Sequence, residues 1–242
     1  MVCERELNGP PQPALHLVRH LATEPSPRTW LDRYGLAEWL DSEGARGIAE
    51  DAAPSHQLVD LVAQSRHLLV SPLTRAQATA NVILDRLDVD SRPEITTVAE
   101  LREAPLPVLP IPRLRLPLNV WGILCRASWF LGYAGTVESR RAAIERAQSV
   151  ARRLDELAPS GPVTVIAHGI MNLLVASELR RLRWTGPRLP NHHHGGTSTF
   201  RRPEPTIPRK GSKTSVADAV RRWCRSRSGW LPRITTINGS ST

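Results

Sequence analysis

Residues 14–20 of this 242-residue chain read ALHLVRH, a short apolar run that ends in Arg19 and His20. Short apolar runs between loop signals are typical of buried β-strands. Two further runs have the same design, HLLV at 67–70 and VTVIA at 163–167, and each is also followed by polar residues. We therefore predict three buried strands whose ends carry potentially reactive side chains.

Helical patterns separate these strands, as expected for a parallel sheet with helices on both faces. A weaker strand at 94–98 and a last edge strand at 197–200 complete the expected sheet. The predicted fold is α/β, a three-layer α/β/α sandwich with a mostly parallel central sheet. The expected helices cover residues 34–52, 57–64, 74–87, 118–131, 138–157 and 169–182.

Composition divides the chain into three parts. Residues 1–13 contain three prolines, which favour an irregular leader. Residues 14–200 carry the alternating strands and helices and form the predicted domain. Residues 201–242 hold ten Lys and Arg against two Asp and Glu, so this segment has +8 of the chain's formal charge of +9. We predict a nearly neutral domain followed by a basic, mostly disordered tail.

Cysteine usage and hydropathy indicate the compartment. Cys3, Cys125 and Cys224 are scattered, without metal-ligand spacing or a disulfide framework, which fits a reducing environment. The N-terminus lacks the apolar run of a secretory signal. The apolar segment at 120–133 is too short to cross a bilayer and contains Arg126. The sequence predicts a cytoplasmic protein without membrane association and leaves the oligomeric state open.

Side chains at the strand ends point to a shared site. In open parallel sheets, ligands bind beyond the carboxyl ends of the strands. We therefore expect Arg19 and His20, Arg75 and His168 to meet in one crevice, although they are far apart in sequence. Guanidinium groups match phosphate oxygens in bidentate fashion, and a neutral imidazole can attack phosphorus. This combination indicates chemistry on a phosphoryl group.

Within this crevice, His20 is the expected nucleophile. Positive charge on Arg19 and Arg75 should lower the pKa of His20 and keep its ring unprotonated at neutral pH. A protonated His168 beside the phosphate would stabilise the negative charge that spreads over the oxygens in the transition state.

Phosphoryl transfer through a histidine also needs an acid for the leaving oxygen and a base for the incoming water. Glu103, in an irregular segment after the third strand, is the expected acid and base, and Glu100 is the competing candidate. Thr23 is either a hydroxyl beside the phosphate or a residue that caps its own loop.

Four motifs occur in an order that resembles the histidine phosphatase superfamily, whose fold is phosphoglycerate mutase-like. LVRHLAT at 17–23 resembles R-H-G-x-T, and SPLTRAQATA at 71–80 resembles S-x-L-x-R-A-x-x-T-A. LRE at 101–103 matches L-x-E, and VIAHG at 165–169 resembles the late V-x-H-G motif. Together the motifs cover roughly residues 14–200.

This resemblance implies a role for each matched residue. His20 would be transiently phosphorylated, and Arg19, Arg75 and His168 would bind the phosphate. Glu103 would serve as the acid and base. The resemblance implies no metal ion and no organic cofactor.

The expected activity is hydrolysis of a small phosphomonoester through a phosphohistidine at His20. One alternative is a phosphomutase of the same superfamily. The other is a catalytically weak phosphate-binding protein with a basic anion-binding tail. Leu21 favours this last interpretation, because it stands where the family usually has glycine and is expected to add bulk near the pocket floor. Nucleic acid is an expected partner only through residues 201–242.

Two other groups of residues are assigned structural roles. Three consecutive histidines at 192–194 have no carboxylate beside them, so we expect a loop and not a metal site. Four tryptophans are expected to pack in the interior and not to form a ligand platform: Trp30, Trp39, Trp121 and Trp129.

Overall fold

The computed structural model describes residues 13–25 and 29–203. The predicted leader up to residue 12 and the predicted tail from residue 204 lie outside the described residues. Within the described part, no helix has both the length and the apolar character needed to cross a membrane.

A five-stranded sheet forms the centre, with the strand order β4-β3-β6-β1-β7. The first four of these strands run parallel, and β7 pairs antiparallel with β1 at the edge. The prediction of an α/β fold with a mostly parallel sheet is confirmed. The strands are β1 (Ala14–Arg19), β3 (His67–Val70), β4 (Glu94–Thr97), β6 (Val163–Ala167) and β7 (Thr197–Arg201).

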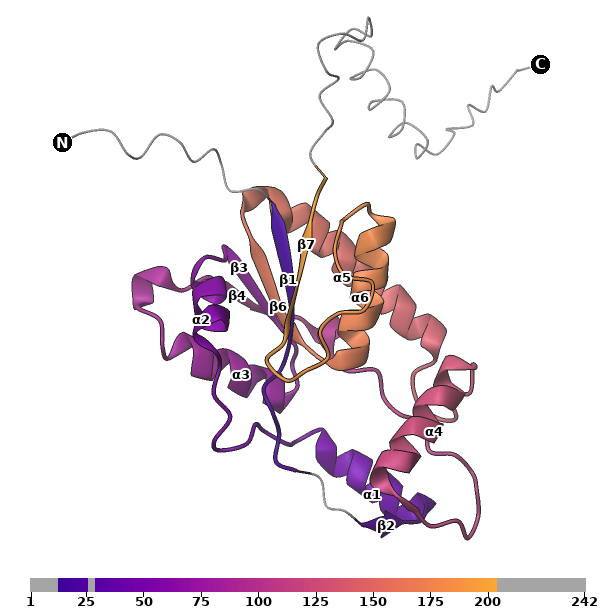
Figure 1. Ribbon diagram of the computed structural model, residues 1–242. Coiled ribbons are helices and arrows are strands. Elements are labelled where there is room, and N and C mark those ends of the chain that lie inside the picture. The colour runs from indigo at the N-terminus through magenta and orange to yellow at the C-terminus, as the bar shows by residue number, and fades with distance from the viewer. Residues whose placement is uncertain (1–12, 26–28, 204–242) are drawn as a thin grey trace, which may run out of the picture. The chain divides into compact units, whose positions relative to one another are not determined.

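Helices cover both faces of this sheet, which gives the predicted three layers (Figure 1). In β3, Leu68 and Val70 pack in one apolar core, and Leu69 between them packs in the other. One core contains α2 (His56–Ala63) and α3 (Thr74–Leu84), and the other contains α5 (Arg140–Leu157) and α6 (Gly169–Arg181). The described residues also contain 3-10 helices at Val89–Ser91, Ala99–Leu101 and Ala158–Ser160.

A separate group of elements lies beyond the carboxyl ends of the parallel strands (Figure 1). It consists of α1 (Arg33–Glu43), α4 (Leu118–Phe130), and the antiparallel pair β2 (Trp30–Leu31) and β5 (Leu116–Pro117). We call this group the α1–α4 unit. Its own apolar cluster centres on Leu36, Trp121 and Cys125.

The four tryptophans differ in their environment. Trp121 and Trp129 are fully buried, as predicted for packing residues. Trp30 is 59% exposed and Trp39 is half-buried, so these two indoles present apolar surface outside the core.

The helix expected over residues 34–52 ends much earlier, at Glu43. Asp32 begins α1 by accepting hydrogen bonds from the backbone N–H groups of its first turn. Beyond Gly44, the chain binds the loop that follows β1 instead of continuing the helix. The N–H of Ala49 donates to the carbonyl of Ala22 over 2.8 Å. Tertiary contacts therefore override the helical pattern in this segment.

Candidate active site

The ends of three neighbouring strands bring the predicted site residues together. The N–H of His20 donates to the carbonyl of Ala167 over 3.0 Å, and the N–H of Ser71 donates to Ile166 over 3.0 Å. Strand pairing thus continues one residue beyond β1 and β3. Because His168 directly follows Ala167, both histidines and Ser71 lie at the same edge of the sheet.

His20 is buried, and one ring nitrogen is already engaged. Nδ1 lies 2.7 Å from the carbonyl oxygen of Leu21. Since a carbonyl can only accept, Nδ1 carries the proton and Nε2 keeps its lone pair. The pKa of His20 is lowered to about 3, first by burial and then by the positive charge of Arg75. The pKa of His20 is thus lowered, as expected, but burial lowers it more than the charges of the arginines do.

His168 is fully buried beside His20, with 5.1 Å between the ring centres. Its Nε2 shares a hydrogen bond of 2.7 Å with the hydroxyl of Ser71. Its Nδ1 is buried without a hydrogen-bond partner among the described residues. Burial, and then the charge of Arg75, lower the pKa of His168 to about 2. The protonated form expected from the sequence therefore requires a nearby negative charge such as a phosphate.

His194 adds a third imidazole that the sequence analysis missed. Its ring centre lies 5.1 Å from that of His20, and its Nδ1 is 3.2 Å from the His20 carbonyl. Residues 192–194 form a loop, as predicted. The edge strand that follows this loop could have indicated that His194 lies near His20. Because this strand pairs antiparallel with β1, the loop before it lies at the carboxyl end of β1. No cluster in the described residues has the ligands to hold a metal ion.

Arg19 and Arg75 line a cavity of about 670 Å³, which we call the arginine cavity. Arg19 donates through one terminal nitrogen to the carbonyl of His192, and its Nε is buried without a partner among the described residues. Arg75 donates to the carbonyl of Glu43 over 2.9 Å. Each guanidinium has five N–H donors, so both retain donors for an anion.

Glu103 lines the arginine cavity and also a smaller one of about 330 Å³. Its carboxylate accepts the backbone N–H groups of Ile170 and Met171, at 3.3 and 3.1 Å, at the start of α6. It also accepts the N–H of Ala104 over 2.9 Å. Glu100 is exposed and lines neither cavity. The structure thus places Glu103, and not Glu100, beside the arginines.

Arg146 on α5 fixes the irregular segment that leads to Glu103. Its guanidinium pairs with the carboxylate of Glu138, with contacts of 2.9 and 2.5 Å. It also donates to the carbonyls of Glu100 and Arg102, over 2.5 and 2.7 Å. Nothing in the sequence marks this role, because Arg146 looks like any charged residue of an amphipathic helix.

Arg126 on α4 contributes a third guanidinium to the arginine cavity. One terminal nitrogen donates to the carbonyl of Ala104 over 3.0 Å, and the other is buried without a partner among the described residues. The group lies 5.2 Å from the ring centre of Trp129. Burial lowers the pKa of Arg126, and the negative charge of Glu103 opposes this effect. In the sequence, Arg126 stands out only as a charged residue within an apolar segment.

The bulk of Leu21 lies toward the loop that contains Gly195. Its side chain is buried against Gly195, where a Cβ would lie 3.1 Å from it, and it lines neither cavity. Gly195 has a φ of +71°, which also favours glycine there. Thr23 is half-buried in the loop after β1, and it too lines neither cavity.

The parallel sheet, the order of the motifs and the buried histidine pair between arginines define a protein of the histidine phosphatase class. The sequence profile of the histidine phosphatase superfamily (branch 1) matches residues 15–205. The chain belongs to this superfamily, which confirms the resemblance seen in the sequence.

Solved structures similar to the chain include a phosphatase and a mutase. The YhfR protein of Bacillus stearothermophilus has a TM-score of 0.49 and 15% identity, over 77% of this chain and 89% of that one. A mycobacterial glucosyl-3-phosphoglycerate phosphatase has a TM-score of 0.47 and 19% identity, over 78% and 94%. A phosphoglycerate mutase from Bacillus anthracis has a TM-score of 0.45 and 15% identity, over 79% and 89%. No curated protein sequence matches the chain.

Thr79 links the two sides of the site, and its loss should loosen the loop after His20. Its buried hydroxyl accepts the N–H of Leu21 over 2.9 Å and donates to the carbonyl of Arg75 over 2.7 Å. Thr79→Val keeps the shape but leaves the Leu21 N–H unpaired, which should cost about 1–3 kcal/mol. We expect the Leu21 amide to exchange with deuterium about tenfold faster or more, as measured by NMR. Thr79→Ser, which keeps the hydroxyl, should retain the protection. Equal protection in the Val variant and the unmodified protein would contradict this role.

Buried neutral histidines should make the fold sensitive to acid. The pKa values of His16, His20 and His168 are lowered from 6.5 to about 4, 3 and 2. Below pH 6.5 the unfolded chain therefore binds more protons, and the free energy of unfolding falls as the pH drops toward 4. Each histidine should contribute about 1.4 kcal/mol per pH unit, measured by urea unfolding at pH 7, 6 and 5. His16→Gln should reduce the slope, and His56→Gln, at an exposed position, should leave it unchanged. A flat profile would disprove the expectation.

Proposed function

We propose that the protein hydrolyses a phosphomonoester through a phosphohistidine intermediate on His20. The observation that carries this proposal is the hydrogen bond of 2.7 Å from Nδ1 of His20 to the Leu21 carbonyl. It fixes the ring in one tautomer and leaves the lone pair of Nε2 as the nucleophile. Burial and the lowered pKa keep this nitrogen unprotonated at neutral pH.

In the first step, Nε2 of His20 attacks phosphorus and the bond from phosphorus to the ester oxygen breaks. Glu103, as the acid, gives its proton to the leaving alkoxide, which departs as the alcohol. Arg19 and Arg75 bind the phosphoryl oxygens, and His168 takes up a proton beside them when the phosphate charge is present. These cationic groups stabilise the charge on the equatorial oxygens.

In the second step, the Glu103 carboxylate removes a proton from water, whose oxygen attacks phosphorus. The bond from phosphorus to nitrogen breaks and inorganic phosphate leaves, which restores neutral His20. All of these steps use side chains alone, so the proposed reaction is independent of metal ions. The cytoplasmic location expected from the cysteine content stays a prediction, and a small phosphorylated metabolite is the expected partner.

His20→Ala should abolish phosphoryl transfer, because it removes the nucleophile of the proposed reaction. We expect kcat/KM for p-nitrophenyl phosphate in chelator to fall by about 10³-fold or more. Acid-labile phosphate should be trapped on the unmodified protein and be absent from the variant. His56→Ala, which changes an exposed histidine on α2, serves as the control and should retain full activity. Equal rates for His20→Ala and the unmodified protein would refute the mechanism, and an isomerised ester in place of inorganic phosphate would identify a mutase.

Glu103→Gln should slow esters with poor leaving groups far more than esters with good ones. An alkoxide must be protonated as it leaves, and p-nitrophenolate need not be, so only the alkyl ester needs the acid in the first step. We expect kcat/KM for ethyl phosphate to fall by about 10²-fold to 10⁴-fold, with a much smaller loss for p-nitrophenyl phosphate. Glu100→Gln is the matched control and should leave both rates unchanged. The same loss on both esters would remove Glu103 from the role of acid.

A further inference from the structure

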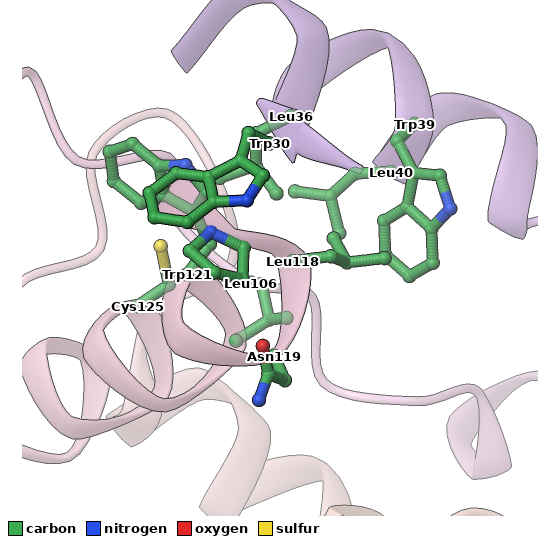
Figure 2. A pocket seen from close by; sticks show the side chains of 11 residues that line it. Trp30, Leu36, Trp39, Leu40, Leu106, Leu118, Asn119, Trp121 and Cys125 are labelled. Carbon is green, nitrogen blue, oxygen red and sulfur yellow. The ribbon is translucent and has the colours of Figure 1, made fainter. Parts of the chain in front are cut away.

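The α1–α4 unit encloses a second large cavity, which we call the tryptophan cavity. Its volume is about 670 Å³, and no charged residue within 13–25 and 29–203 lines it. Figure 2 shows apolar side chains from α1 and from α4 facing this space. The lining residues that carry the argument are Trp30, Trp39, Leu40, Leu106, Gly122 and Cys125.

Polar groups at the wall of the tryptophan cavity offer little to a charged ligand. The indole N–H of Trp121 already donates to the carbonyl of Leu31 over 2.8 Å. Burial raises the pKa of the Cys125 thiol, so this group remains protonated and uncharged at neutral pH. The exposed indole surface of Trp30 and the half-buried indole of Trp39 present flat apolar area instead. The chemistry of this wall fits an apolar group.

The tryptophan cavity lies directly against the arginine cavity. Trp39, Leu40 and Leu106 line both. On α4, Cys125 lines the tryptophan cavity and the next residue, Arg126, lines the arginine cavity. A molecule whose phosphate lies at the arginines can therefore extend its organic part across these shared side chains.

We propose that the tryptophan cavity binds the organic part of the substrate, so that the substrate is a phosphate monoester of a hydrophobic alcohol. This inference rests on the function proposed above and names its substrate class. The cavity volume falls within the range of small-molecule sites, about 300–1,000 Å³. Burial of the alkyl or aryl group against the tryptophans stabilises the complex in proportion to the apolar area removed from water.

Gly122 provides a way to fill this cavity without disturbing the fold. It lies within α4 and lines the cavity, and a Cβ built on it would meet no atom within 4 Å. A larger side chain there can extend into the open space. Replacing glycine inside a helix also improves helix propensity, so Gly122→Phe should fold at least as stably as the unmodified protein. Gly122→Ala makes the same backbone change without filling the cavity and is the matched control.

The experiment compares n-octyl phosphate with ethyl phosphate, two esters with similar leaving groups and different apolar chains. For the unmodified protein, we expect kcat/KM to be about tenfold higher or more for the octyl ester, from the added buried methylenes. Gly122→Phe should remove this preference, by lowering kcat/KM for the octyl ester much more than for ethyl phosphate. Gly122→Ala should retain the preference. Thermal unfolding of all three proteins confirms that each is folded.

Binding of n-octylphosphonate and ethylphosphonate to His20→Ala, measured by calorimetry, separates this inference from the proposed reaction. Tighter binding of the octyl compound, lost when Gly122→Phe is added, would support the substrate class even if no ester is hydrolysed. Hydrolysis without a preference for the octyl chain would overturn the inference and leave the proposed function intact. An equal loss on both esters in Gly122→Phe, or equal binding of both phosphonates, would also overturn it.

Discussion

Parallel pairing of β3, β6 and β1 is the constraint on which the rest of the site depends. These adjacent strands have nearly aligned ends, so the residue after each strand reaches the same edge of the sheet. His20, Ser71 and His168 become neighbours for that reason, although as many as 148 positions separate them in the printed sequence. A shift of one residue in any pairing would turn a core residue outward and an active-site residue inward. The apolar alternation of the strands and the geometry of the site are therefore fixed by the same register.

Burial lowers the pKa values of His20 and His168 more than neighbouring charge does. His20 and His168 lose most of their contact with water, and this loss alone disfavours the protonated ring. Arg75 and Arg19 add to the effect because they carry charge of the same sign. The arrangement favours a negatively charged ligand. Its charge would raise the pKa of His168 and allow this ring to take up a proton. Positive groups that stay fixed before the ligand arrives need little reorganisation during a reaction.

Local motifs predicted the residues whose positions depend on their own strand or helix. Arg19, His20 and His168 are examples, because each directly follows or ends a strand that the apolar pattern identifies. His194, Arg126 and Arg146 act across long distances in sequence, and their roles depend on packing that no short pattern records. Gly195 illustrates the same limit: its missing side chain makes room for Leu21, a contact that no short pattern records. The end of α1 was mispredicted for a related reason, since contacts with the loop after β1 replaced the helix.

Two of the anchors that hold Glu103 lie outside the segment that follows it. Arg146 holds the carbonyls just before it, and the first N–H groups of α6 hold its carboxylate. Residues 105–117 can therefore change in length and sequence without removing these anchors, to which Ala104 adds its own N–H. Divergence of substrate preference, in evolution or in a laboratory library, can proceed in the α1–α4 unit while the carboxylate and the strand ends keep their geometry. The architecture separates the part of the molecule that can vary from the part that cannot.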